Sequence, residues 1–166
     1  LVFSGDIGRK GLAIVGNPVV PSGADMVIME STYGNRDHAS VEGAKAELGR
    51  VVRETAMRGG KVFIPAFAVG RTQELVFALH ELADEGAIPR IPICIDSPLA
   101  TRATTVFERH RELFDESEPF VRAHRGVAEG PFKFPMLTYT QTVEESKALD
   151  ARAGPMIIIA ASGMAL

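Results

Sequence analysis

Residues 61–86 read KVFIPAFAVGRTQELVFALHELADEG, a strand-like run followed at once by a helix-like one. The run Lys61–Ala66 is apolar after its first residue, which is typical of a buried strand. Gly70 or Arg71 then opens a helix whose apolar residues recur at helical spacing, and Gly86 ends it. A buried strand that leads directly into a helix is the repeating unit of parallel sheets.

The alternation of strand and helix continues on both sides of this stretch. The expected elements are strands at 25–30, 91–95 and 156–161, helices at 40–57, 98–110 and from 142 onward, and a long, partly irregular excursion at 112–139. The strands at 61–66, 91–95 and 156–161 are almost continuously apolar, as strands buried on both faces should be. This order predicts an α/β fold, with a parallel sheet in three layers and helices on both faces.

The carboxyl ends of the expected strands gather polar and glycine-rich residues. In open parallel sheets, ligands bind beyond these ends. Three of the ends also open helices, near Arg71, Ser97, and Ser162 with Gly163, and free backbone N–H groups at a helix start favour anions such as phosphate. This edge therefore predicts a phosphorylated or polyanionic ligand. The competing interpretation is structural, with an exposed arginine at an ordinary helix entry and serines that act only as helix caps.

Two acids, Asp6 and Glu30, each end a short apolar run. Carboxylates fixed at the ends of rigid strands are typical of metal-hydrolase sites. Asp6 is interpreted as a metal-bridging carboxylate or as a turn aspartate bonded to its own backbone. Glu30 is interpreted as a functional acid or as a structural acid held in a salt bridge, since an apolar strand end is a costly place for an unpaired carboxylate.

Only four histidines occur, and no two lie within a few residues of each other. A zinc hydrolase needs a cluster of imidazoles, and the sequence predicts that this chain cannot supply one. We expect His38 in a loop, and His80, His110 and His124 on the surface or on helix faces. The chain is therefore interpreted as a piece of an enzyme that carries part of its active site.

The bulk composition is that of one ordinary globular domain. The 166 residues are 46% hydrophobic and 23% charged, with a net charge of −3. A dedicated nucleic-acid binder usually has a basic excess, so non-specific binding of polyanions is disfavoured, although a local basic cleft is compatible with these numbers. The single cysteine, Cys94, is expected to be buried, and the lack of a disulfide framework fits a reducing cytoplasm.

Several other classes are disfavoured. No apolar run approaches ~20 residues, so no membrane span is expected. The glycine-rich segments match neither the dinucleotide fingerprint nor the Walker pattern, and Thr72 and Ser97 lack a neighbouring His and Asp for nucleophilic catalysis. The chain does not begin with Met and ends abruptly, so we expect both ends to be cut from a longer protein, and no signal peptide is expected.

Five ordered segments carry a resemblance to a known family. They are FSGDIGR (3–9), MESTYGNR (29–36), IPAFAVGRTQE (64–74), DSPLA (96–100) and AASGM (160–164). Together they resemble the β-CASP branch of the metallo-β-lactamase superfamily, whose members include RNA-processing nucleases. The resemblance covers essentially the whole chain.

The resemblance implies a role for each candidate residue. Asp6 matches the carboxylate that bridges two zinc ions, and Glu30 matches a group that orients a catalytic histidine. The residues that match motifs lining the RNA cleft are Tyr33, Arg71, Ser97, Ser162 and Gly163. The zinc pair would generate a hydroxide at neutral pH for attack on an RNA phosphodiester.

The chain also departs from the family pattern. The histidine-rich metal motifs belong before residue 1, and the two β-CASP histidines belong after Leu166. Residues 1–35 therefore resemble the end of the metallo-β-lactamase domain, and residues 36–166 resemble a β-CASP domain that is incomplete at its C-terminus. The isolated chain is expected not to hold this zinc pair tightly, to be inactive, and to self-associate through the surface that the missing domain would cover.

The leading hypothesis is that the chain is part of a zinc-dependent ribonuclease, and two alternatives stay open. One is a non-catalytic module that binds RNA or another partner. The other is a parent hydrolase that acts on a small phosphate or ester. The sequence does not distinguish endonuclease from 5′-exonuclease action.

Overall fold

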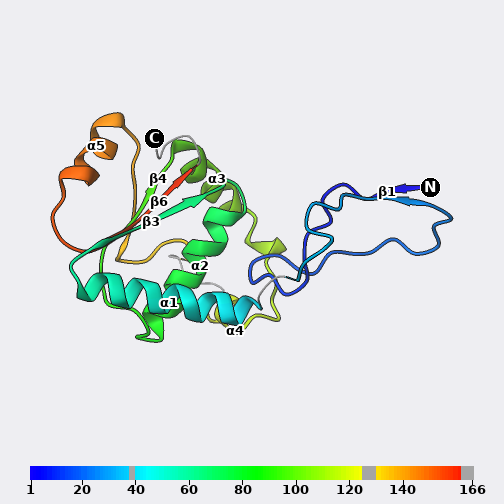
Figure 1. Cartoon of the computed structure of the whole chain (residues 1–166), viewed down its shortest axis with the longest axis horizontal. Coiled ribbons are helices and arrows are strands. Elements are labelled where there is room, and N and C mark those ends of the chain that lie inside the picture. Colours follow the sequence, from blue (N-terminus) through cyan, green and yellow to red (C-terminus); the bar gives the residue numbers. More distant parts are fainter. Residues whose placement is uncertain (38–39, 125–129, 162–166) are drawn as a thin grey trace.

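The computed structural model describes residues 1–37, 40–124 and 130–161. Its centre is a four-stranded sheet with the strand order β3-β6-β4-β5, in which every pairing is parallel (Figure 1). The strands are Lys61–Ala66 (β3), Met156–Ala161 (β6), Ile93–Asp96 (β4) and Leu137–Tyr139 (β5). The α/β class and the parallel sheet predicted from the sequence are confirmed.

The side chains of β4 and β6 point alternately into two hydrophobic clusters. The larger cluster combines residues of α1 (Val41–Met57), α2 (Arg71–Asp84) and α3 (Pro98–Arg109) with Ile93, Ile95, Ile157 and Ile159. The smaller cluster joins Leu149 of α5 (Val143–Ala151) to Cys94, Met156 and Ile158. Because alternate residues of a strand face opposite sides of a sheet, helices cover both faces. The three-layer architecture and the burial of Cys94 are confirmed.

Polar caps fix the points at which helices begin. Ser97 Oγ accepts a hydrogen bond from Ala100 N at 3.2 Å, at the start of α3. Before α5, Thr142 Oγ1 accepts from Glu145 N at 3.2 Å, while the Glu145 carboxylate accepts from Thr142 N at 3.3 Å. This reciprocal pair is the capping box that the sequence predicts.

The prediction that β3 is buried on both faces is wrong. β3 lies at the edge of the sheet, and the smaller cluster under α5 draws on β4 and β6 but not on β3. Phe63 pairs in register with Ile158 and shares its face, yet it is 59% exposed. An apolar run alone does not show whether a strand lies at the centre or at the edge.

Two expected strands are shifted or shortened. β4 begins at Ile93 rather than at 91, because Pro92 has no N–H to donate and contributes only its carbonyl, which accepts from Ile157 N at 2.9 Å. The strand expected at 25–30 is reduced to β2 (Val27–Ile28), which pairs with the equally short β1 (Val2–Phe3).

The excursion at 112–139 contains elements that its sequence does not indicate. They are the 3-10 helix η1 (Arg111–Leu113), the helix α4 (Pro119–Ala123) and the strand β5. Aromatic contacts hold the excursion against the helices: the ring of Phe120 lies 4.9 Å from that of Phe77, and the ring of Phe132 lies 6.1 Å from that of Phe107.

The N-terminal segment, residues 1–37, extends away from the sheet and its helices (Figure 1). β1 and β2 pair in parallel within it, and most of their apolar side chains are exposed. Ile14 is the buried contact of this segment with the core, and Val15 beside it bridges to Phe114. None of the helices in the described ranges is long and apolar enough to cross a bilayer.

Candidate functional site at the carboxyl edge of the sheets

The parallel pairing of β1 and β2 brings the two candidate acids to the same end of this small sheet. Phe3 pairs with Ile28, and Ser4 N donates to Ile28 O at 3.0 Å. Asp6 and Glu30 follow these positions, and both are exposed. The structure thus places one carboxylate beyond the carboxyl end of each strand, as expected, while the roles of the two acids stay predictions.

A local hydrogen bond holds the Glu30 side chain. Its Oε2 accepts from Thr32 N at 2.8 Å, and this bond lowers the pKa of Glu30 below its ordinary value. Tyr33 follows in the same loop, half-exposed, with the Arg36 guanidinium 5.5 Å from its ring centroid, where a cation and an aromatic face attract. This loop therefore presents an ionised acid beside an aromatic ring.

The structure does not gather all predicted site residues in one place. Three of them lie on the projecting N-terminal segment: Asp6, Glu30 and Tyr33. Two lie where helices leave the carboxyl edge of the main sheet: Arg71 and Ser97. The last two, Ser162 and Gly163, are outside the described residues.

At the start of α2, the backbone N–H groups are already occupied. Gly70 N donates to Oε1 of Gln73 at 2.7 Å. Arg71 N and Thr72 N donate to carbonyl oxygens of the preceding turn, both at 3.1 Å. The free amides that were expected to bind an anion are therefore not available at these three residues, and attraction for phosphate rests on the Arg71 side chain.

Gln73 makes this helix start rigid. The side chain is fully buried, and its Nε2 donates to Thr104 Oγ1 of α3 at 2.9 Å and to Ala68 O at 3.2 Å. Gly70, which it also binds, has a φ of +80°, a conformation that residues with a Cβ rarely adopt. Sequence reasoning gave Gln73 no role, because its partners lie up to 31 residues away.

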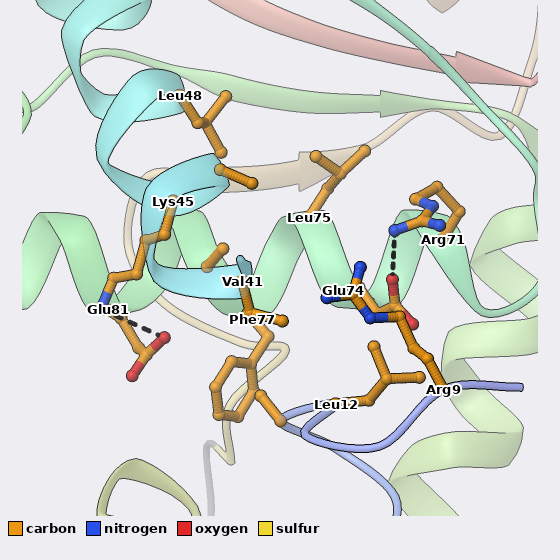
Figure 2. Close-up of a pocket in the computed structure, with 13 residues that line it drawn as sticks. Arg9, Leu12, Val41, Lys45, Leu48, Arg71, Glu74, Leu75, Phe77 and Glu81 are labelled. Carbon is orange, nitrogen blue, oxygen red and sulfur yellow. Dashed lines mark hydrogen bonds and ion pairs between the residues drawn. The ribbon is translucent and has the colours of Figure 1, made fainter. Parts of the chain in front are cut away.

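Arg71 lies at the rim of a pocket between the N-terminal segment and the helices α1 and α2 (Figure 2). Its guanidinium donates to Glu74 at 2.7 Å, and at the other end of the pocket Lys45 pairs with Glu81 at 3.3 Å. The remaining lining is largely apolar and includes Leu12, Leu48, Leu75 and Phe77. Three basic side chains line the pocket, Arg9, Lys45 and Arg71, together with two acidic ones, Glu74 and Glu81. The pocket therefore has only a small excess of positive charge.

Phe67 is a candidate that sequence reasoning missed. It follows β3 directly, is 74% exposed, and lines a surface hollow together with Arg71 and Leu75. Proteins that bind single-stranded nucleic acid use such exposed rings to stack bases, with cations nearby for the phosphates. The sequence feature that could have identified Phe67 is an aromatic residue directly after the carboxyl end of a predicted strand.

Asp96 and Ser97 end β4 with two different structural roles. Asp96 is buried, and its carboxylate accepts from Thr140 Oγ1 at 2.7 Å and from Ser146 Oγ at 2.8 Å. Ser97 is only 3% exposed, and its hydroxyl caps α3. The structural interpretation of Ser97 as a helix cap is thus supported, and a role in binding RNA stays a prediction.

Histidines were expected on the surface or on helix faces, and His80 does lie on α2, while His110 is exposed. The sequence did not indicate that His80 is buried or that the fold brings it close to His124. Among the described residues, one group of three could hold a metal ion, namely His80, Asp84 and His124. This group includes neither Asp6 nor Glu30, so the described residues do not complete the two-zinc site that the resemblance implies. His38 is outside the described residues.

Comparison with known proteins supports the resemblance to the β-CASP family. Residues 72–166 match the model of the Beta-Casp domain. Over 164 residues the chain is 38% identical to "Ribonuclease TTHA0252" of Thermus thermophilus, covering 99% of this chain and 37% of that protein. It is 29% identical over 169 residues to "Endoribonuclease YSH1" of Saccharomyces cerevisiae, covering 99% of this chain and 21% of the relative.

A third relative carries a different name. Over 142 residues the chain is 35% identical to "Transcription termination factor FttA" of Thermococcus kodakarensis, covering 84% of this chain and 21% of that protein. The chain thus spans well under half the length of each of these relatives. The family model, which covers more than half of the chain, and the agreement of the parallel α/β fold with it show that the chain belongs to the β-CASP family.

Proposed function

We propose that this chain is part of a zinc-dependent ribonuclease, to which it contributes one metal ligand and an RNA-binding surface. The observation that carries the proposal is family membership together with similarity, over nearly the whole chain, to proteins named as a ribonuclease and an endoribonuclease. RNA is accordingly the proposed substrate and partner.

We also propose that residues 1–35 and 36–166 belong to different domains. The exposed apolar faces of β1 and β2 support this division, because an isolated two-stranded sheet is marginally stable in water unless it packs on something else. Packing against the rest of a metallo-β-lactamase domain would bury these faces and fix the positions of Asp6 and Glu30.

The proposed roles follow from position and chemistry. Asp6 would hold the zinc pair, whose chemistry when bound is to supply a hydroxide at neutral pH. Glu30, ionised and held by Thr32 N, would orient a histidine from outside this chain. On the main sheet, Phe67 would stack on a base while Arg71 contacts a phosphate. The further proposed contacts to RNA are Tyr33, Ser97, Ser162 and Gly163.

The test compares the full-length protein with the 166-residue chain on end-labelled single-stranded RNA, with and without a chelator. We expect metal-dependent cleavage by the full-length protein and none by the 166-residue chain. A full-length protein that binds RNA without cutting it would favour a non-catalytic module. Hydrolysis of a small phosphodiester, with RNA left intact, would favour the small-substrate hydrolase.

A further inference from the structure

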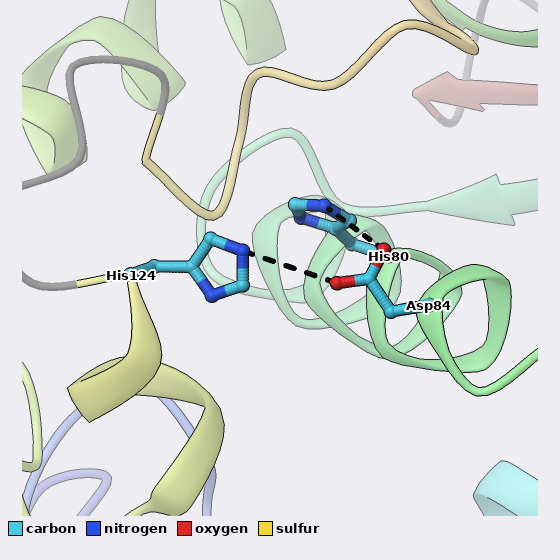
Figure 3. A group of neighbouring side chains, drawn as sticks. All are labelled: His80, Asp84 and His124. Carbon is cyan, nitrogen blue, oxygen red and sulfur yellow. Dashed lines mark ion pairs between the residues drawn. The ribbon is translucent and has the colours of Figure 1, made fainter.

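Three potential metal ligands from two separate helices meet at the C-terminal end of α2. His80 and Asp84 are four residues apart, about one helical turn, so their side chains share a face of the helix. His124 follows α4 directly. Figure 3 shows both imidazoles beside the carboxylate: His80 Nε2 is 3.9 Å from Asp84 Oδ1, and His124 Nε2 is 4.0 Å from Asp84 Oδ2.

The other ring nitrogen of each histidine fixes its tautomer. His80 Nδ1 lies 2.9 Å from Pro131 O, and His124 Nδ1 lies 2.9 Å from Phe120 O. A carbonyl oxygen only accepts hydrogen bonds, so each Nδ1 must carry a proton and donate it. In a neutral imidazole the Nε2 atom then bears a lone pair. Two lone pairs therefore lie near the Asp84 carboxylate, and a cation bound between them would be attracted by all three groups.

Protons are poor candidates for that cation. His80 is 5% exposed, and burial lowers the pKa of its imidazole. The rings of His80 and His124 are 4.9 Å apart, so charging both would add repulsion. Asp84 would offset part of this cost, but its side chain is 55% exposed, and water weakens its attraction. Burial therefore favours the neutral form of the His80 imidazole, which is the form that ligates metals.

Aromatic packing orients both rings in advance. His80 stacks on Phe134 with centroids 4.0 Å apart and an interplanar angle of 10°. Phe120 lies edge-on to His80 at 5.0 Å and packs against His124 at 4.1 Å. Rings held by packing, with the outer nitrogen bonded to a carbonyl, are the usual support of histidines that ligate metals.

We propose that His80, Asp84 and His124 bind one divalent transition-metal ion, with Zn²⁺ as the natural probe. Two imidazoles and a carboxylate are a ligand set that zinc accepts, with water at the fourth position. The three candidate ligand atoms lie within 4.8 Å of one another. An ion placed between them could therefore lie about 2.8 Å or less from each atom, whereas zinc–ligand bonds are about 2.0–2.2 Å long. Asp84 is the last, exposed residue of α2, and its carboxylate can rotate to close this difference.

A bound ion would link α2 to α4 and so hold the excursion at 112–139 against the helices. The site shares no ligand with the zinc pair proposed at Asp6, and its failure would leave the proposed ribonuclease function untouched. A metal that binds the folded chain and not the unfolded one raises the melting temperature.

The test is calorimetric titration of the 166-residue chain with Zn²⁺, after treatment with EDTA and dialysis. We expect one ion per chain. Asp84→Asn and His124→Ala should each weaken binding at least 10- to 100-fold, roughly the loss seen when even a group that only orients a ligand is removed. Both positions are at helix ends and partly exposed, so these variants should fold, which circular dichroism checks.

Two controls separate this site from other zinc binding. His110→Ala removes an exposed histidine whose Nδ1 is 2.9 Å from Glu112, and Asp25→Asn removes an exposed carboxylate with no proposed role; both should bind like the unmodified chain. Zn²⁺ should raise the melting temperature of the unmodified chain and of both controls, but not of Asp84→Asn. Absence of saturable one-to-one binding, or equal affinity in His124→Ala and His110→Ala, would overturn the proposal.

Discussion

At the scale of single residues, attraction for an anion at the start of α2 rests on side chains. The backbone N–H groups of Gly70, Arg71 and Thr72 already donate to other acceptors. The sequence correctly predicted the helix starts at Arg71 and Ser97, while ligand binding at the carboxyl edge of the main sheet stays a prediction. It could not show that Gln73 occupies Gly70 N, because the rotamer of Gln73 is set by Thr104 on another helix. A motif identifies which residue types are present, whereas their hydrogen bonds are decided by packing.

Phe67 gives a direct test of RNA binding at this edge. In the full-length protein, Phe67→Ala should weaken RNA binding about 5- to 150-fold, because stacking of one base contributes about 1–3 kcal/mol. We expect the loss to appear in KM or Kd, with kcat little changed. Phe63→Ala is the matched control, an exposed phenylalanine of β3 placed about 13 Å back along the chain. Equal effects of the two substitutions would argue against a stacking role for Phe67.

Gln73 gives a test of rigidity at the same edge. Gln73→Leu removes the bonds to Gly70 N, Ala68 O and Thr104 Oγ1, although Thr104 Oγ1 keeps its bond to Ala100 O. The free energy of unfolding should fall by about 1–3 kcal/mol, measured by urea denaturation of the 166-residue chain. Gln141→Leu, at an exposed position, should change it by less than about 0.5 kcal/mol. An unchanged midpoint for Gln73→Leu would show that the amide bonds do not hold the loop.

At the scale of helices and strands, local signals were reliable where a single element carries them. β3, β6 and the start of α5 lie where periodicity and capping residues place them. β5 was missed because three residues with an exposed centre carry no pattern of their own, and its strand form comes from pairing with β4. The position of β3 at the edge was missed for the same reason, since strand order is a long-range property.

Asp96 links three elements, and its removal should show how much that link stabilises the fold. Its carboxylate accepts from Thr140, just after β5, and from Ser146 of α5. Asp96→Ala should lower the free energy of unfolding by about 3–6 kcal/mol, since it removes two hydrogen bonds to a charged group, which contribute about 1.5–3 kcal/mol each. Asp150→Ala, an exposed acid on α5, should change it by less than about 0.5 kcal/mol. Equal stability of the two variants would mean that the buried carboxylate is dispensable.

At the scale of the whole molecule, the N-terminal segment stands apart from a well-packed α/β body (Figure 1). Its parallel strands put Asp6 and Glu30 at one end, as the sequence predicted, and its exposed apolar side chains agree with the proposal that another domain packs against them. The meeting of His80 and His124 could not be anticipated, because 43 residues separate them (124 minus 80, less one) and only the packing of the excursion brings them together.

The exposed faces of β1 and β2 predict self-association of the 166-residue chain. The apolar side chains that these strands and their neighbours leave exposed are Leu1, Phe3, Met26, Val27, Ile28 and Met29. Sedimentation velocity should show oligomers that grow with concentration. The double variant Phe3→Ser with Val27→Ser should reduce them, whereas Met57→Ser, an exposed methionine at the end of α1, should not. A strictly monomeric chain at high concentration would contradict the prediction.

We propose that Asp6 serves a metal-dependent RNA-cleaving site, which the rate of RNA cleavage by the full-length protein tests directly. Asp6→Asn keeps the size of the side chain and removes its charge, and Asp25→Asn does the same to another exposed acid of the N-terminal segment. We predict that kcat/KM falls about 100-fold or more in Asp6→Asn, because loss of a metal ligand should cost at least as much as loss of a group that orients a ligand. In Asp25→Asn, kcat/KM should stay near the value of the unmodified protein. Cleavage by Asp6→Asn at the unmodified rate would contradict the account.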